Sequence, residues 1–158
     1  MRHDPPCHPA DIAVIRQLIV ELAVYEREPD AVKASEADLH EALFGDRPLA
    51  EAVLAEIAGE AVGMALFFSN FSTWAGKGGI YLEDLFVRPQ ARGQGVGKAL
   101  LVHLAAIAVA RDYSRFEWSV LDWNTPAIGF YKGLGAVMQD EWTKMRVEGD
   151  ALARLARG

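Results

Sequence analysis

Three glycines alternate with other residues at Gly93, Gly95 and Gly97, directly ahead of the long apolar stretch 99–110. Glycine lets backbone N–H groups come close to a ligand, and the beginning of a helix carries a partial positive charge. This pattern predicts a loop that binds an anion, and a phosphate or pyrophosphate is the expected ligand.

Two common phosphate motifs do not match this loop. A P-loop requires a glycine five positions before Gly97, where the chain has Arg92. A dinucleotide fingerprint requires a third glycine at the position of Lys98, and it normally lies near the start of its fold. The loop therefore favours another kind of phosphate-bearing ligand.

The acids Glu83 and Asp84 interrupt the apolar segment 80–87, which reads as a strand ending before Pro89. A carboxylate in such a strand is costly to bury without a partner or a task. Glu83 is a candidate base, and an acid that faces water on an edge strand is the alternative. Asp84 points to the opposite face of a regular strand, unless a bulge brings both acids together.

A second candidate group follows the segment 115–121, which also reads as a strand. The phenol of Tyr131 could donate a proton in a reaction, or Tyr131 could be a core residue. Asn124 could bind a cofactor or simply cap a helix. A cationic substrate would need acids and aromatic rings; the candidates are Tyr25, Glu26, Trp74, Asp84, Trp123 and Trp142.

Periodicity and turn residues predict the elements that position these groups. Asp11 can cap a helix that ends before Pro29, and Ser35 opens a capping box for a short helix that ends at Gly45. The remaining elements are a hairpin of 52–57 and 61–68 around Gly59-Glu60, a loop over 69–79, a helix from about 99 to 110, a helix with Thr125 as cap and Pro126 in its first turn, and closing strands at 136–139 and 142–147.

Composition bounds the class of protein. The 158 residues carry a net charge of −6 and one cysteine, Cys7. A disulfide scaffold is excluded, and a reducing, cytoplasmic compartment is expected. The acidic balance argues against a nucleic-acid partner, and no apolar run is long enough to span a membrane. The four histidines lack the spacing of a metal site, so no metal is expected. One domain over 1–158 is expected.

Several segments, read together, resemble the GCN5-related N-acetyltransferase (GNAT) superfamily, and within it the diamine and thialysine acetyltransferase branch. The resemblance covers about residues 10–147. The segments that carry it are 21–26, 44–48, 72–77, 81–87, 92–98, 121–124 and 130–136.

This resemblance implies an α/β fold with a mixed, largely antiparallel sheet, flanked by helices and splayed near 83–87, where acetyl-CoA enters. It implies acetyl transfer to a primary amine of a small cationic substrate, with Glu83 as general base and Tyr131 as general acid. The implied cofactor-binding residues are Leu85, Phe86, Val87, Arg92, Gly93, Gln94, Gly95, Val96, Gly97, Lys98, Asn124, Pro126, Ala127 and Tyr131. The implied substrate-binding residues are Tyr25, Glu26, Trp74, Glu83, Asp84 and Trp123.

The chain also departs from the family pattern. Asp4-Pro5-Pro6 interrupts the expected first strand, and no acid precedes Trp74, as it tends to in polyamine-acetylating members. Thialysine or another short amine is therefore a candidate acceptor in addition to polyamines. A zwitterionic substrate would need a carboxylate partner, such as Arg27 or Lys77. The alternatives are a protein or peptide acetyltransferase and a non-catalytic acyl-CoA sensor. A homodimer is expected from the family.

Overall fold

The computed structural model describes residues 2–3 and 7–158, so the prolines expected to interrupt the first strand lie outside the described residues. The chain divides into two compact units, residues 1–121 and residues 122–158, and each is described by itself. One domain over the whole chain stays a prediction.

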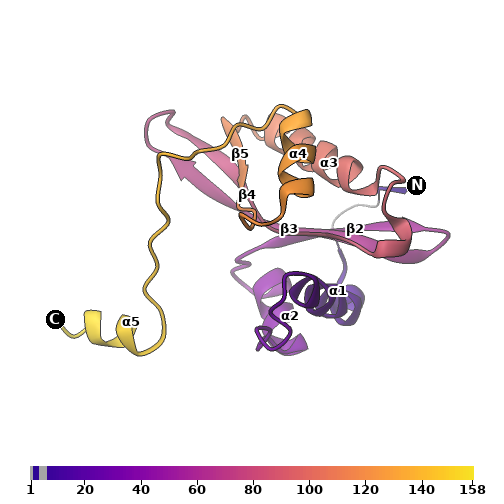
Figure 1. Cartoon of the computed structure of the whole chain (residues 1–158). Coiled ribbons are helices and arrows are strands. Elements are labelled where there is room, and N and C mark those ends of the chain that lie inside the picture. The colour runs from indigo at the N-terminus through magenta and orange to yellow at the C-terminus, as the bar shows by residue number, and fades with distance from the viewer. Residues whose placement is uncertain (1, 4–6) are drawn as a thin grey trace. The chain divides into compact units, whose positions relative to one another are not determined.

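The first unit is built on a five-stranded sheet in the order β1-β2-β3-β4-β5 (Figure 1). The strands are β1 (Arg2–His3), β2 (Glu51–Ile57), β3 (Glu60–Ser72), β4 (Lys77–Val87) and β5 (Arg115–Trp118). Neighbouring strands are antiparallel except β4 and β5, which are parallel. The mixed, largely antiparallel sheet is as predicted.

The hairpin between β2 and β3 is confirmed, but its turn lies one residue earlier than the predicted Gly59-Glu60, because Glu60 already pairs with Ile57. Its turn residues Ala58 and Gly59 both have positive φ, 51° and 81°, as a tight two-residue hairpin turn requires. The predicted loop over 69–79 is wrong, because β3 continues to Ser72 and β4 already begins at Lys77. Glycine permits this pairing: a Cβ on Gly79 would lie 2.5 Å from Asn70 Oδ1 and 3.0 Å from the Arg115 carbonyl oxygen.

Helices α1 (Ile12–Tyr25) and α2 (Glu36–Phe44) come before the main strands. The Ser35 capping box is confirmed: Ser35 Oγ accepts from Asp38 N at 3.1 Å, and Asp38 Oδ2 accepts from Ser35 N at 2.8 Å. The predicted cap by Asp11 is wrong. A 3₁₀ turn, η1 (Pro9–Asp11), comes first, and the Asp11 carboxylate accepts from His8 N at 2.7 Å instead.

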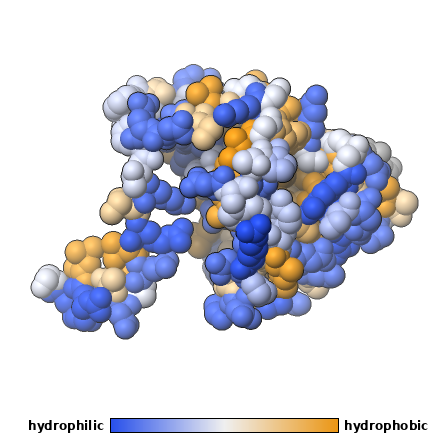
Figure 2. Space-filling model, in the orientation of Figure 1, coloured by the Kyte–Doolittle hydropathy of each residue, from blue (hydrophilic) through white to orange (hydrophobic). Residues whose placement is uncertain are grey.

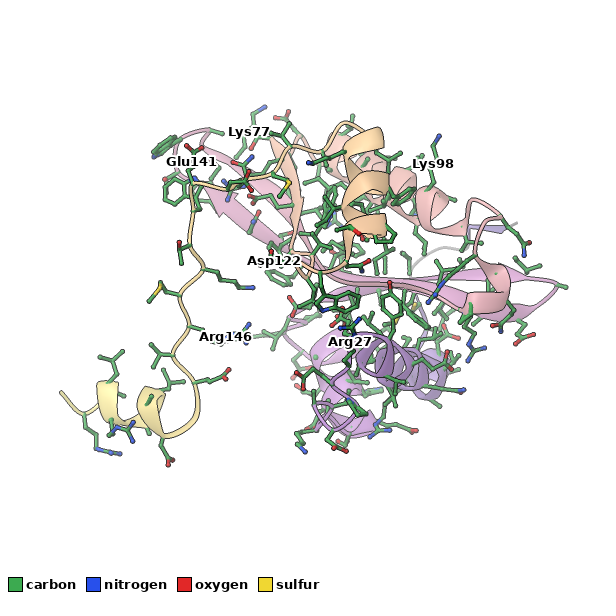
Figure 3. All side chains as sticks on the ribbon, viewed as in Figure 1. Arg27, Lys77, Lys98, Asp122, Glu141 and Arg146 are labelled. Atoms are coloured by element: carbon green, nitrogen blue, oxygen red, sulfur yellow. The ribbon has the colours of Figure 1, made fainter. Side chains whose placement is uncertain are left out.

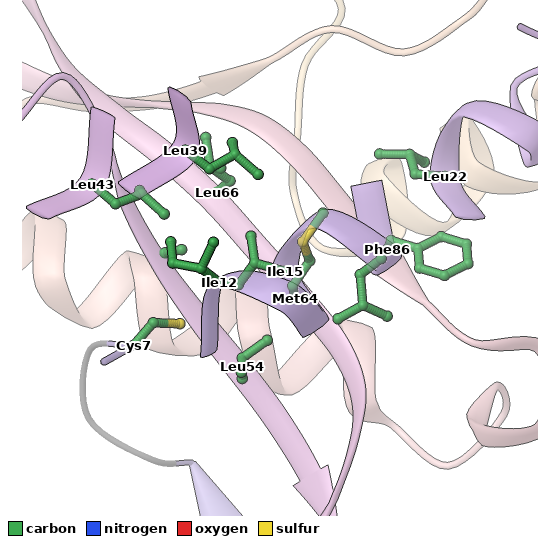
Figure 4. Packing of buried hydrophobic residues seen from close by; sticks show 12 residues of the cluster. Cys7, Ile12, Ile15, Leu22, Leu39, Leu43, Leu54, Met64, Leu66 and Phe86 are labelled. Carbon is green, nitrogen blue, oxygen red and sulfur yellow. The ribbon is translucent and has the colours of Figure 1, made fainter. Parts of the chain in front are cut away.

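Both helices pack on one face of the sheet, called here the α1 face. Figure 4 shows Ile12 and Ile15 of α1 beside Leu54 and Met64 of the strands. Leu66 lies on the same face, two residues along β3 from Met64. The buried apolar stripe of α1 thus holds the sheet in place from this side, mainly through the hydrophobic effect.

Helix α3 (Val96–Ala110) packs against β3 and β4 from the opposite side. Its buried residues include Leu100 and Leu104, and Phe67 and Ile80 are buried on the strands. A 3₁₀ turn, η2 (Pro89–Ala91), joins β4 to the glycine loop. The helix begins at Val96, three residues earlier than the apolar run suggests, so part of the glycine motif is helical.

The second unit contains α4 (Thr125–Gly133) and α5 (Gly149–Leu155). Asn124, not Thr125, caps α4, because Asn124 Oδ1 accepts from Ala127 N at 3.4 Å. The predicted strands at 136–139 and 142–147 are absent from the described structure. Alternating apolar residues favour a strand only where another strand supplies hydrogen bonds, and Val137 and Met145 are instead 78% and 86% exposed. Figure 2 shows apolar side chains on the surface of α5 as well, where Leu155 is exposed.

Candidate active site

Glu83 lies at a break in the register between β3 and β4. Leu66 and Phe67 are consecutive in β3, and they pair with Asp84 and Leu82 of β4. Glu83 is therefore an extra residue of β4 with no partner in β3. An inserted residue of this kind is a β-bulge. Because Leu66 lies on the α1 face, the bulge turns Asp84 toward that face. The sequence allowed a bulge at Glu83 and Asp84 as one possibility, and the structure has one there.

Strands β4 and β5 separate at the same point. Their pairing runs only from Gly79–Arg115 to Leu82–Trp118. The predicted strand 115–121 is thus too long, because β5 ends where the splay begins. Beyond Leu82, none of the described residues pairs with this edge of β4. The predicted splay near 83–87 is confirmed.

The open edge exposes backbone groups of β4. Arg88 N donates to Val62 O at 2.8 Å, toward β3. Since the groups of successive residues in an antiparallel strand point to alternate sides, those of Leu85 and Val87 point to the open edge. Val87 O accepts from Arg92 Nε at 2.9 Å. The Val87 N–H and both backbone groups of Leu85 are therefore placed to bind an extended chain of amides.

Three carboxylates influence one another beside the bulge. Burial, the largest cause, and the negative charges of Glu83 and Glu26 together raise the pKa of Asp84 to about 6. Burial and the charge of Glu83 also raise the pKa of Glu26, which lies just beyond α1. Glu83 itself is exposed. Such a cluster is suited to bind a cation and to accept a proton from it.

The glycine loop adopts conformations that favour glycine, with φ of 76° at Gly93 and 80° at Gly95. Gly95 precedes α3, and no side chain caps that helix. The first α3 hydrogen bond within the backbone runs from Ala99 N to Gly95 O. The N–H groups of residues 96–98 thus lie at the positive end of the helix without intrahelical partners. This is the geometry of an anion site.

A surface hollow of about 430 Å³ lies beside this helix end. Its lining includes Gly95, Lys98, Ala99, Val102, His103 and Ala106. Lys98 is exposed, and Figure 3 shows its side chain pointing away from α3. These features fit a coenzyme A thioester. The open strand edge can bind its amides, and the uncapped helix end and Lys98 can bind its phosphates.

Arg92 bridges the loop and the end of α1. Its guanidinium lies 4.9 Å from the centre of the Tyr25 ring and 5.8 Å from that of Phe86. Both contacts are within cation–π range. Arg92 thus contacts the residue that precedes Glu26 in the chain. The sequence suggested Arg92 only as a cofactor ligand and did not suggest this contact.

The structure does not bring every predicted site residue to the bulge. Trp74 lies in the β3–β4 turn and is 94% exposed. That turn is at the far end of β4 from Glu83, about 20 Å away at the usual rise per residue. Trp123, Asn124, Pro126, Ala127 and Tyr131 belong to the second unit and are described there alone. Asn124 caps α4, which was the second of the two roles that the sequence suggested for it.

Sequence reasoning missed two structural partners of the site. Arg88, at the end of β4, contacts Glu21 of α1 through both carboxylate oxygens. Arg115 of β5 forms an ion pair with Glu117. The resemblance already placed substrate-contacting residues at Glu117, Trp118 and Ser119, with the alternation of a strand as the other explanation, but the sequence did not single out Arg115.

Comparison with known proteins identifies the family. The model of the Acetyltransferase (GNAT) family matches residues 15–136. The chain belongs to the GNAT acetyltransferase family. The resemblance and the enzyme class expected from the sequence are confirmed.

This GNAT acetyltransferase is similar to named enzymes along most of its length. It is 40% identical to thialysine N-epsilon-acetyltransferase of Sus scrofa, over 92% of each chain. It is 32% identical to L-ornithine N5-acetyltransferase NATA1 of Arabidopsis thaliana, over 91% of this chain and 83% of that protein. An integron cassette protein of V. cholerae has the same fold, with a TM-score of 0.82 and 30% identity over 98% of this chain and 96% of that one.

Proteins of the GNAT acetyltransferase family use acetyl-CoA, and the site described above fits that cosubstrate. Among the described side chains, no group of three or more His, Cys, Asp or Glu is arranged to hold a metal ion. The helices that the structure describes include none long and apolar enough to cross a membrane.

Proposed function

We propose that this acetyltransferase moves the acetyl group of acetyl-CoA directly to a primary amine of a small cationic acceptor, a thialysine-like amino acid or a diamine. The observation that carries the proposal is the bulge at Glu83, which sets three carboxylates beside the open edge of β4. An amine with a pKa near 10 arrives protonated and cannot attack a thioester. A carboxylate cluster both binds that cation and can take its proton.

The cosubstrate supplies the acyl thioester, and this chain's residues hold it. The backbone groups of Leu85 and Val87 pair with the amides of the pantetheine arm. The N–H groups at the start of α3 bind the pyrophosphate, and Lys98 adds a positive charge at the hollow. Gln94 in the glycine loop and Val96 at the start of α3 contribute backbone contacts. Asn124, Pro126 and Ala127 are proposed to contact the arm from the start of α4.

In the proposed reaction, Glu83 accepts a proton from the acceptor ammonium, directly or through water. Asp84 and Glu26 hold the cation near the reaction, and Tyr25 and Trp123 supply aromatic contacts. The amine nitrogen then bonds to the acetyl carbon as the carbon–sulfur bond breaks. Tyr131 gives its phenolic proton to the leaving sulfur. The nitrogen loses two protons: Glu83 takes the first before attack, and the second, released as the amide forms, restores the proton that Tyr131 gave to sulfur. The net products are the N-acetylated acceptor, the CoA thiol and one proton, which Glu83 passes to solvent.

Two relatives support an amino-acid acceptor over a polyamine. The pig enzyme is named for thialysine and the Arabidopsis enzyme for L-ornithine. The absence of an acid next to Trp74 points the same way. Peptide acetylation and a non-catalytic sensor are the remaining alternatives. A homodimer and a cytoplasmic location are proposed on the family resemblance alone.

The deciding experiment follows release of the CoA thiol with acetyl-CoA and a panel of acceptors. The panel is thialysine, lysine, ornithine, putrescine, spermidine, an aminoglycoside and a basic peptide, compared by kcat/KM. A clear preference for the small amines supports the proposal. A preference for the peptide would show that the acceptor is a peptide and not a small amine. Tight acetyl-CoA binding without thiol release from any acceptor would favour the sensor instead.

A further inference from the structure

A row of side chains continues the α1 face of the sheet beyond the acidic cluster. Phe68, Tyr81 and Glu117 lie directly opposite one another across β3, β4 and β5. Residues that pair across strands share a face, and Phe68 is two residues along β3 from Leu66. Tyr81, Glu117 and Asp84 therefore all lie on the α1 face.

Two opposite charges stand together on this row. Arg115 Nε lies 2.8 Å from Glu117 Oε1, and their side chains are 39% and 38% exposed. Asn70 Nδ2 also donates to Glu117 Oε1, at 3.0 Å, and Arg115 Nη2 donates to Phe71 O at 3.3 Å. These bonds fix both side chains in place. Glu117 Oε2 and Arg115 Nη1 make no hydrogen bond with the described residues, so each charge has an atom left for a ligand.

Glu117 lies nearer to the bulge than Arg115, which is opposite Gly79, four residues before Glu83. Glu117 is opposite Tyr81, two residues before Glu83, which corresponds to about 7 Å along β4. Between them the Tyr81 ring stacks on Phe68, with centroids 5.2 Å apart, and Tyr81 OH lies 2.8 Å from Ser119 Oγ. An amino acid with a lysine-length side chain spans a similar distance and would cross this aromatic floor.

We infer that Arg115 and Glu117 form a head-group subsite, in which Arg115 binds the α-carboxylate and Glu117 the α-ammonium of an amino-acid acceptor whose side-chain amine lies at Glu83. The inference rests on the proposed function and narrows its acceptor to zwitterions. A diamine of the same length would satisfy Glu117 but leave Arg115 without a ligand.

The other cations suggested by the sequence fit this task less well. Lys77 forms an ion pair with Asp112 at 2.7 Å and lies six residues from Glu83 on β4. Arg27 follows Glu26 at the end of α1, and Figure 3 shows it there, away from Lys77. Arg27 is therefore the competing carboxylate partner and belongs in the test.

The test compares two acceptors that differ only in the carboxylate: thialysine and its decarboxylated analogue, bis(2-aminoethyl) sulfide. Arg115→Gln is expected to lower kcat/KM for thialysine at least about tenfold, mainly through KM, and to change kcat/KM for the diamine much less. Glu117→Gln is expected to lower kcat/KM for both acceptors, because both carry a second ammonium. The acetyl-CoA Kd should stay constant in both variants, which separates lost recognition from misfolding.

Arg111→Gln is the matched control, since Arg111 pairs with Glu51 away from this face and the substitution removes the same charge. It should leave the ratio of the two acceptors unchanged. Equal losses for both acceptors in Arg115→Gln, or the selective loss appearing in Arg27→Gln instead, would overturn the subsite while the proposed function stood. A wild-type protein that acetylates neither acceptor would overturn the proposed function and this inference with it.

Discussion

Arg88 donates to both carboxylate oxygens of Glu21, at 3.0 Å from Nε and 2.9 Å from Nη2, and so ties the end of β4 to α1. The Arg88 side chain is 12% exposed, and its Nη1 also donates to Ala61 O at 2.9 Å. The open edge of β4 and the end of α1, which carry the proposed cofactor and acceptor contacts, are thus held together by one side chain.

Arg88→Ala is expected to lower the free energy of unfolding by about 2–3 kcal/mol, because it leaves Glu21 partly buried without its partner. Urea unfolding followed by circular dichroism measures this. Lys77→Ala is the control: its pair with Asp112 is 46% and 83% exposed, and an exposed pair contributes about 1 kcal/mol or less. Similar small losses in both variants would mean that Arg88 does not hold the two elements together.

Glu83→Gln is expected to lower kcat/KM about 100-fold or more, because an amide cannot accept the proton of the acceptor amine. Steady-state kinetics with thialysine over a range of pH measures this. Glu28→Gln removes an exposed acid near α1 and should leave the rate unchanged. If Asp84→Asn abolished activity while Glu83→Gln retained it, the proton would go to Asp84.

Tyr131→Phe is expected to lower kcat about 100-fold with little change in the acetyl-CoA Kd, because only the proton donor is lost. Thiol release and calorimetric titration measure the two quantities separately. Tyr113→Phe is a matched loss of one hydroxyl, which contacts Ser69 Oγ at 2.8 Å, and it should keep wild-type turnover. An unchanged kcat in Tyr131→Phe removes Tyr131 from the chemistry.

Asp84→Asn is expected to stabilise the protein at neutral pH. The pKa of Asp84 is raised from 3.8 to about 6, so the folded state binds a proton more tightly than the unfolded state. Stability from this group is therefore full below about pH 4 and is lost as pH rises through about 6. The variant should exceed the wild type by up to about 3 kcal/mol at pH 8 and match it near pH 4. Urea unfolding at both pH values tests the sign.

Gly95→Ala and Gly97→Ala should change stability in opposite directions. Gly95 has a φ of 80°, where a Cβ costs about 1–2 kcal/mol. Gly97 lies inside α3, and a Cβ added there would lie 3.7 Å from Val87 Cγ2, an ordinary van der Waals contact. Gly97→Ala should therefore raise the free energy of unfolding by about 0.5–1 kcal/mol. Thermal unfolding measures both. Equal shifts would show that the left-handed conformation of Gly95 does not matter for stability.

The sequence alone determined those features that depend on neighbouring residues. The Gly59 hairpin, the Ser35 capping box and the glycine run before α3 each follow from local backbone preferences, and they appear in the structure as predicted. The motifs also identified the family, because several short segments in a fixed order carry that resemblance.

Only the tertiary structure decided which strands pair and where pairing stops. The bulge at Glu83 and the end of β5 at Trp118 depend on register between strands, which no local pattern sets. The predicted strands at 136–139 and 142–147 failed for the same reason, since a strand needs a partner. The contacts of Arg88 with Glu21 and of Arg115 with the Asn70–Glu117 pair likewise join elements that packing brings together.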